Sequence, residues 1–162
     1  MASPRFGRAP FAASLIAAAW LILDQISKHW AVSRLGTEGR SLSLPGPIDL
    51  TLSINHSNAF GMTPVAGDIT RWGLVAFNLG IGAALMWAIW ARRFSTLTVL
   101  AFGFILAGAI GNAWDRIAIG GVVDFLDASK IGFPWIFNLA DAGVDIGIGL
   151  VLLDSFTSRK RV

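Results

Sequence analysis

The chain contains no cysteine, and its 162 residues include only two histidines. The absence of cysteine excludes disulfide bonds, a thiol nucleophile and any zinc or iron–sulfur site built on cysteine ligands. The histidines, His29 and His56, lie too far apart for the HExxH spacing of zinc hydrolases. These counts argue against a zinc hydrolase, and no metal or other cofactor is expected.

Charged residues are also scarce. They make up 14% of the chain, whereas soluble domains contain about 25%. Hydrophobic residues reach 54%, and the mean hydropathy is +0.64. The net charge is +3, but the basic residues form short clusters between apolar stretches instead of one long run. This composition predicts an integral membrane protein and gives no indication of a nucleic-acid partner.

Four segments are candidates for membrane-spanning helices, because a span needs roughly 20 apolar residues. They cover residues 9–30, 72–91, 94–114 and 135–155 approximately. The first resembles a cleaved signal peptide, but its apolar character continues past Ala17–Ala19, so we expect it to be retained. The fourth is interrupted by Asp141 and Asp145. We predict one membrane-embedded domain over residues 1–162.

The positions of the basic residues predict the orientation of these spans. Seven of the thirteen lie in the short segments before the first span, between the second and third, and after the fourth: Arg5, Arg8, Arg92, Arg93, Arg159, Lys160 and Arg161. Basic residues concentrate in cytoplasmic loops. The fold class predicted is therefore a mainly α, four-helix membrane bundle with both termini in the cytoplasm. Two longer connections, about 31–71 and 115–134, would lie outside.

The first outer connection carries the pattern of a β-strand. Ile48, Leu50, Leu52 and Ile54 alternate with polar residues, which is typical of a half-buried strand. We expect a small sheet that rests with its apolar face on the bilayer. Asp127 and Lys130, in the second outer connection, are expected to be solvated charges.

Polar residues gather at the predicted outer ends of the spans, where ionisable side chains are costly and often functional. Asp24 and Lys28 have the i,i+4 spacing of an ion pair on one helix face. The other members of this group are Asn112, Asp115 and Arg116 on the third span, Asp124 in the second outer connection, and Asp141 on the fourth span. A structural alternative stays open, in which Asp24–Lys28 and Asp115–Arg116 are ion pairs that only lock helix packing.

Two of these acids, Asp124 and Asp141, have no basic residue at pairing distance in the sequence. The 17 residues between them allow the two carboxyl groups to meet. Neighbouring carboxyl groups cannot both ionise easily, so such a pair holds one proton near neutral pH. One carboxylate can then activate a water molecule while the other, as an acid, protonates a peptide carbonyl. The pair predicts an aspartic peptidase.

Five motifs occur in order along the chain: Asp24-Gln25-Ile26-Ser27-Lys28, Asn55…Ala59-Phe60-Gly61, Gly108-Ala109-Ile110-Gly111-Asn112-Ala113-Trp114-Asp115-Arg116, Val122-Val123-Asp124-Phe125 and Phe137-Asn138-Leu139-Ala140-Asp141. In this combination the chain resembles the lipoprotein signal peptidases (signal peptidase II, aspartic peptidase family A8) from about residue 15 to 155. It departs from the family pattern Asn-x-Gly-Ala-Ala-Phe, because it reads Asn55-His56-Ser57-Asn58-Ala59-Phe60.

The resemblance implies roles for individual residues. Asp124 and Asp141 match the catalytic dyad of the family. Positions that match substrate-binding residues are Asn112, Arg116, Asn55, Asn138, Gly108 and Ala140. Supporting positions are Asp24, Lys28, Asp115, Phe60 and Gly61. The outer strand region resembles a periplasmic cradle, and residues 60–68 resemble a mobile lid.

The resemblance also implies a reaction and a location. The enzyme would remove signal peptides from diacylglyceryl-modified prolipoproteins, cutting on the N-terminal side of the lipidated cysteine. It would work as a monomer among the lipids of the bacterial inner membrane, with its active site at the periplasmic face. The main alternative is a proton-coupled transporter or channel subunit, which would distribute its acids through the depth of the bilayer.

Overall fold

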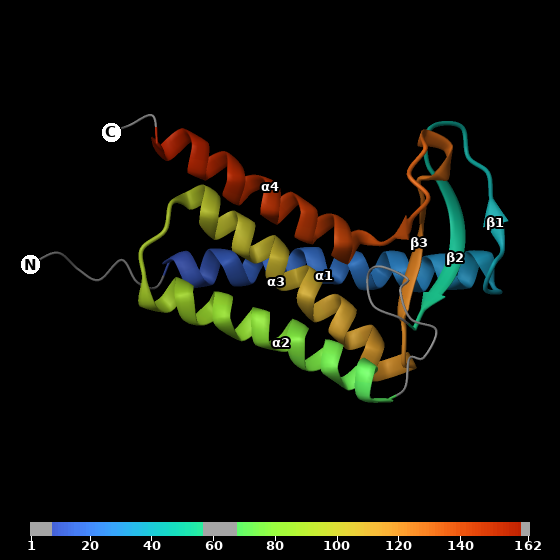
Figure 1. Cartoon of the computed structure of the whole chain (residues 1–162), viewed down its shortest axis with the longest axis horizontal. Coiled ribbons are helices and arrows are strands. Elements are labelled where there is room, and N and C mark those ends of the chain that lie inside the picture. The colour runs from blue at the N-terminus through green and yellow to red at the C-terminus, as the bar shows by residue number, and fades with distance from the viewer. Residues whose placement is uncertain (1–7, 57–67, 160–162) are drawn as a thin grey trace, which may run out of the picture.

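The computed structural model describes residues 8–56 and 68–159 as four helices and a four-stranded sheet (Figure 1). The helices are α1 (Arg8–Leu35), α2 (Asp68–Ala91), α3 (Thr96–Ile119) and α4 (Leu139–Arg159). The strands are β1 (Ser41–Leu42), β2 (Asp49–Asn55), β3 (Val122–Asp127) and β4 (Ile136–Phe137), and a short 3₁₀ helix covers Ser129–Ile131. The helices form a bundle, and the sheet crosses one end of it.

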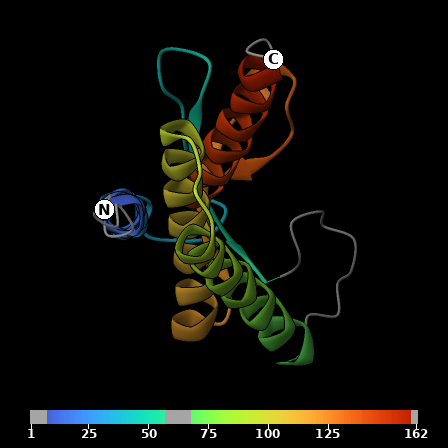
Figure 2. The same ribbon diagram turned by 90° about the vertical axis from the view of Figure 1, so that its left-hand side faces the viewer.

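Helix α3 lies at the centre of the bundle and packs against each of the other three helices (Figure 2). It begins at the N-cap Ser95, whose side chain accepts a hydrogen bond from the backbone of Thr98. It ends at Gly120, which has φ +80°, a left-handed conformation that glycine adopts without steric cost. Helix α3 thus reaches Ile119 and carries the whole third-span motif on one regular element.

Within the described residues, α1, α2 and α3 are long and apolar enough to cross a membrane. They also expose large apolar side chains outward, among them Phe11, Ile26 and Phe77. Such a surface suits a hydrocarbon environment. The chain is therefore a multi-pass membrane protein, mainly helical with a small antiparallel sheet, as the composition predicted.

Glycines let the helices approach closely, as is common in membrane bundles. A Cβ atom at Gly103 would lie 2.9 Å from the backbone oxygen of Ala13 on α1. A Cβ atom at Gly143 would lie 2.5 Å from the indole nitrogen of Trp20. The first predicted span is thus an integral part of the bundle.

The sheet is antiparallel throughout, in the order β1-β2-β3-β4. Leu50 and Leu52 of β2 are buried with Phe125 of β3 against Ala31 and Leu35 of α1. The predicted alternation is confirmed, but the apolar face packs on the last turns of α1 instead of resting on the bilayer. The reason is that α1 continues to Leu35, beyond the expected end of the span, and supplies the apolar partner.

The two predicted solvated charges are exposed (Lys130) and partly exposed (Asp127), and they also fix the connections at one end of the sheet. The ammonium of Lys130 lies 2.6 Å from Asp49 and also donates to the Leu44 carbonyl and the Ser43 hydroxyl. Asp127 accepts hydrogen bonds from Thr51 and Ser129, which hold its pKa below the usual range. These contacts join segments more than 70 residues apart in the chain.

Candidate active site

The predicted polar residues meet where α1, α3 and α4 reach the sheet (Figure 1). Each of five elements contributes at least one of them. They are Asp24 and Lys28 from α1, Asn55 from β2, Asn112, Asp115 and Arg116 from α3, Asp124 from β3, and Asp141 from α4. Asn138, which directly precedes α4, lies with them. The expected convergence on one layer is confirmed for these residues.

Asp124 occupies the third position of β3, opposite Ser53 of β2, and only 4% of its surface is exposed. The Asn138 side-chain amide donates to its Oδ1 at 2.6 Å, and the Asn55 amide donates to its Oδ2 at 3.2 Å. Burial, together with the charge of Asp141, raises the pKa of Asp124 to about 7, although the two amide hydrogen bonds act in the opposite direction. Asp124 is therefore a carboxyl group that exchanges a proton near neutral pH.

Asp141 lies in the first turn of α4 and is held there by Asn138. The Asn138 Oδ1 accepts a hydrogen bond from the Asp141 backbone at 2.9 Å, and Asp141 Oδ2 accepts from the Asn138 backbone at 3.4 Å. This reciprocal arrangement is a capping box. Since Asn138 also bonds Asp124, one residue contacts both carboxyl groups. A helix N-terminus further favours negative charge at this place.

Asn112, on α3, contacts polar residues of both α1 and α4. Its Nδ2 donates to Asp141 Oδ1 at 2.8 Å. Its Oδ1 accepts from the ammonium of Lys28 at 3.2 Å and from the Asn138 amide at 3.3 Å. Asn112 therefore connects the charged network on α1 to the carboxyl group on α4.

Lys28 is the centre of that charged network and is 3% exposed. Its ammonium lies 2.9 Å from Asp24 Oδ2 and 2.9 Å from Asp115 Oδ2. The Asp24–Lys28 pair is confirmed. The alternative Asp115–Arg116 pair is wrong for the described part of the chain, because neighbouring helix residues point in different directions and Asp115 turns toward α1.

Asp115 and Asp24 also hold backbone groups next to the two candidate acids. Asp115 Oδ2 accepts from the backbone N–H of Val123, the neighbour of Asp124. Asp24 Oδ1 accepts from the backbone N–H of Ala140, the neighbour of Asp141. The supporting residues thus fix the strand and the helix that carry Asp124 and Asp141.

Arg116 lies one turn beyond Asn112 on α3 and is 8% exposed. Its Nη1 donates to the Asn112 carbonyl at 3.2 Å. Arg71, from the first turn of α2, donates to the carbonyls of Arg116 and Ile117. This contact satisfies carbonyl groups at the end of α3 and joins α2 to the helix that carries Asn112.

Two residues without a predicted role, Trp20 and Gln25, also lie in this network. Trp20 donates from its indole nitrogen to the Leu139 carbonyl at 2.7 Å, next to the start of α4. Gln25 donates to Asp24 and to Asp115. Gln25 belongs to the motif that runs from Asp24 to Lys28, so the sequence did indicate its involvement. The position of Trp20, in contrast, depends on how α1 packs against α4.

Other predicted site residues lie elsewhere. Gly108 and Ala140 are buried in the contact between α3 and α4, where a Cβ atom at Gly108 would collide with the Ala140 carbonyl. Both residues therefore contribute to the packing of α3 against α4, and their contact with substrate stays a prediction. Phe60, Gly61 and most of the expected lid lie outside the described residues. Asp145 is exposed on α4.

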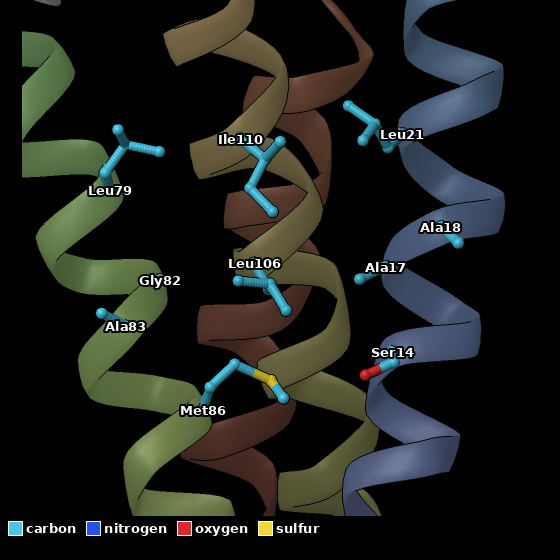
Figure 3. A pocket seen from close by; sticks show the side chains of 10 residues that line it. All are labelled: Ser14, Ala17, Ala18, Leu21, Leu79, Gly82, Ala83, Met86, Leu106 and Ile110. Atoms are coloured by element: carbon cyan, nitrogen blue, oxygen red, sulfur yellow. The ribbon is translucent and has the colours of Figure 1, made fainter.

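An apolar groove of about 450 Å³ lies between α1, α2 and α3 (Figure 3). Leu21, Gly82, Leu106 and Ile110 are among the residues that line it, and its one polar side chain is Ser14. Figure 3 shows α4 behind α3, so the groove lies on the face of α3 turned away from α4. It contains no titratable side chain and is separate from the polar layer.

Comparison with known proteins gives a consistent result. Residues 16–157 match the family described as signal peptidase (SPase) II. The chain is 43% identical to the lipoprotein signal peptidase of Caulobacter vibrioides over 99% of this chain and 95% of that protein. It is 43% identical to the lipoprotein signal peptidase of Gloeothece citriformis over 90% of this chain and 89% of that protein.

Solved structures agree with the sequence comparisons. A bacterial membrane enzyme solved by the in meso method at 2.3 Å resolution is similar with a TM-score of 0.80. It is 26% identical, over 92% of this chain and 90% of that chain. A second bacterial membrane enzyme, solved at 1.9 Å resolution, is similar with a TM-score of 0.75. It is 28% identical, over 87% of this chain and 90% of that chain.

Proposed function

Because this chain belongs to the signal peptidase II family, and is thus a membrane aspartic peptidase that processes prolipoproteins, we propose that Asp124 and Asp141 are its catalytic dyad. The observation that carries this proposal is their shared attachment to Asn138, which bonds Asp124 through its side chain and Asp141 through its backbone. The alternative of a transporter or channel subunit is not favoured.

The dyad would hydrolyse the peptide bond with one shared proton. The ionised carboxylate takes a proton from water, and the water oxygen bonds to the scissile carbonyl carbon. The protonated carboxyl group gives its proton to the carbonyl oxygen. The tetrahedral intermediate then collapses: the C–N bond breaks, and the leaving nitrogen takes the proton that came from water. One hydroxyl of the intermediate returns its proton to the carboxylate that had protonated the carbonyl oxygen, which re-forms the C=O bond and restores the shared proton. A pKa of about 7 for Asp124 keeps a proton available on the pair near neutral pH.

Arg116 and Asn55 flank this pair and are proposed to hold the substrate backbone. Arginine has five N–H donors in a planar fork, and Arg116 donates from Nη1 to Asn112. Its other donors suit the carbonyl groups of an extended peptide. Asn55 lies on β2 opposite Val122 of β3, so a substrate beside it would also lie next to Asp124.

The finer substrate and location are proposed from the family. The substrate is a prolipoprotein with a diacylglyceryl-modified cysteine, cut on the N-terminal side of that cysteine. Helix α4 is proposed as a fourth span of one 162-residue domain, which would act as a monomer in the inner membrane with its site at the periplasmic face. The apolar outer surfaces of α1, α2 and α3 support direct contact with membrane lipids.

The decisive experiment measures processing in lipid vesicles. Asp124→Asn and Asp141→Asn are each expected to reduce cleavage of a diacylglyceryl-modified prolipoprotein by at least about 100-fold, while the protein still inserts. Asp127→Asn on the same strand and Asp145→Asn on the same helix are matched controls that keep the dyad. Cleavage at the normal rate by either dyad variant would exclude the assignment.

The cysteine-free sequence allows a clean test of orientation. A single cysteine replaces Thr37, which is exposed after α1, or Arg92, which is exposed after α2. A membrane-impermeant maleimide added to intact spheroplasts is expected to label Thr37→Cys and to label Arg92→Cys only after lysis. The reverse pattern would contradict a periplasmic site.

A further inference from the structure

Lys28 contacts three acceptors at once from inside the bundle. Its ammonium is 2.9 Å from Asp24, 2.9 Å from Asp115 and 3.2 Å from the Oδ1 of Asn112. An ammonium group has three donors and no acceptor. The three contacts therefore use the full hydrogen-bonding capacity of Lys28. A partner that turned an N–H group toward the ammonium would be repelled, so each of the three must face it with an oxygen.

This restriction fixes the orientation of the Asn112 amide. A side-chain amide has one oxygen and one NH₂ group, and the two orientations are nearly equal in shape. The oxygen of Asn112 faces two donors, the Lys28 ammonium and the Asn138 amide. Its NH₂ group must then face Asp141, to which it donates at 2.8 Å. In the opposite orientation the NH₂ group would meet the ammonium, and the amide oxygen would meet a carboxylate.

We propose that Lys28 is a positioning residue, which acts through Asn112 by holding its amide with the NH₂ group toward Asp141. This inference rests on the proposed dyad. It gives Lys28 a part in the reaction beyond the packing of α1 against α3. Without Lys28, the Asn112 amide can rotate so that its oxygen faces Asp141. Asp141 Oδ1 then loses the hydrogen bond from the Asn112 NH₂ group and faces an oxygen instead.

The test is a double-mutant cycle between Lys28 and Asn112, measured in lipid vesicles with the diacylglyceryl-modified substrate. Lys28→Met has nearly the same shape and no donor. It is expected to lower kcat at least about 10-fold with a smaller change in KM. In the Asn112→Ala background, the same Lys28→Met change is expected to lower kcat by less than about twofold, because residues that act through one another are not additive. Equal losses in the two backgrounds would overturn the inference.

A second comparison does not depend on the activity of Asn112→Ala. Asp24→Asn disturbs the same ammonium but leaves its contact with Asn112, so Lys28→Met is expected to lower kcat at least about fivefold more than Asp24→Asn does. If Lys28→Met fails to accumulate because two buried acids lose their partner, Asp24→Asn/Lys28→Met is compared with Asp24→Asn instead. Equal kcat values in this comparison would assign Lys28 to packing alone.

Asp141→Asn is measured beside these variants. An inactive Asp141→Asn with an additive cycle would overturn only the role of Lys28. An active Asp141→Asn would overturn the dyad itself.

Discussion

Asn138 and Asp141 cap each other at the start of α4, with the Asp141 backbone donating to Asn138 Oδ1 at 2.9 Å and the Asn138 backbone donating to Asp141 Oδ2 at 3.4 Å. The cap places a carboxyl group on the rigid first turn of a helix instead of on a loop. The same Asn138 side chain donates to Asp124 at 2.6 Å. The start of α4 and the geometry of the dyad are therefore set by one residue.

The two duties of Asn138 can be separated by substitution. Asn138→Ser keeps a good N-cap but is too short to donate to Asp124. We expect processing to fall at least about 10-fold. The loss of this donor raises the pKa of Asp124, so the alkaline limb of the pH–rate profile, where the dyad loses its shared proton, should move to higher pH. The profile is measured with the purified protein in vesicles.

Asn138→Ala is the matched variant, because it loses the cap as well as the donor. It should be less stable than Asn138→Ser by about 1 kcal/mol while showing the same pH profile. An unchanged alkaline limb in both variants would show that the Asn138 amide does not control the dyad.

The raised pKa of Asp124 predicts a pH dependence of stability. Folding moves this pKa from its ordinary 3.8 to about 7, so the folded state holds the proton more tightly than the unfolded state. The contribution of Asp124 to stability is therefore greatest below about pH 4, falls as the pH rises toward 7, and is constant above it. The full difference corresponds to about 4 kcal/mol.

Asp124→Asn removes this titration. Thermal unfolding in detergent at several pH values between 4 and 8 should show a smaller decline for Asp124→Asn than for the unmodified protein. Asp127→Asn, on the same strand, should not flatten the decline, because the pKa of Asp127 is lowered and its titration runs in the opposite direction. Parallel curves for Asp124→Asn and the unmodified protein would contradict a raised pKa.

Gly111 is predicted to be intolerant of any side chain. A Cβ atom there would lie 2.7 Å from Asp24 Oδ2 and 3.4 Å from the Ala140 side chain. Gly111→Ala should lower the free energy of unfolding by about 1–3 kcal/mol and disturb Asp24, which binds the Ala140 backbone.

Gly80→Ala on α2 is the control, because a Cβ atom there has no neighbour within 4 Å among the described residues. Its melting temperature in detergent should be unchanged or slightly higher. Equal melting temperatures for Gly111→Ala and Gly80→Ala would show that α1, α3 and α4 can separate without loss.

The Trp20 indole is predicted to stabilise the junction of α1 and α4. In the unmodified protein the Trp20 and Phe104 rings pack edge to face, with their centroids 5.1 Å apart. Trp20→Phe keeps an aromatic ring beside Phe104 but loses the hydrogen bond to the Leu139 carbonyl. The expected cost is about 1 kcal/mol. Trp114→Phe is the control, since Trp114 is 59% exposed, and it should melt at nearly the same temperature as the unmodified protein.

The membrane class, the strand at residues 48–54 and the candidate site residues were all predictable from the amino-acid sequence. Long apolar runs, period-two alternation and scarce charges are local properties, so they can be read without knowing the fold. The i,i+4 pair Asp24–Lys28 was likewise predictable, because helix geometry alone brings its members together.

The partners of these residues, in contrast, depend on how the helices and strands pack in three dimensions. Asp115 turns to Lys28 instead of Arg116, Gly108 packs against α4, and the apolar face of β2 meets α1 instead of the bilayer. These outcomes depend on the angles and distances between elements far apart in the chain, which side-chain packing sets and no local pattern encodes. The same physical reason explains why the sequence predicted Asp124 and Asp141 but not their common attachment to Asn138, which depends on the position of β3 next to the start of α4.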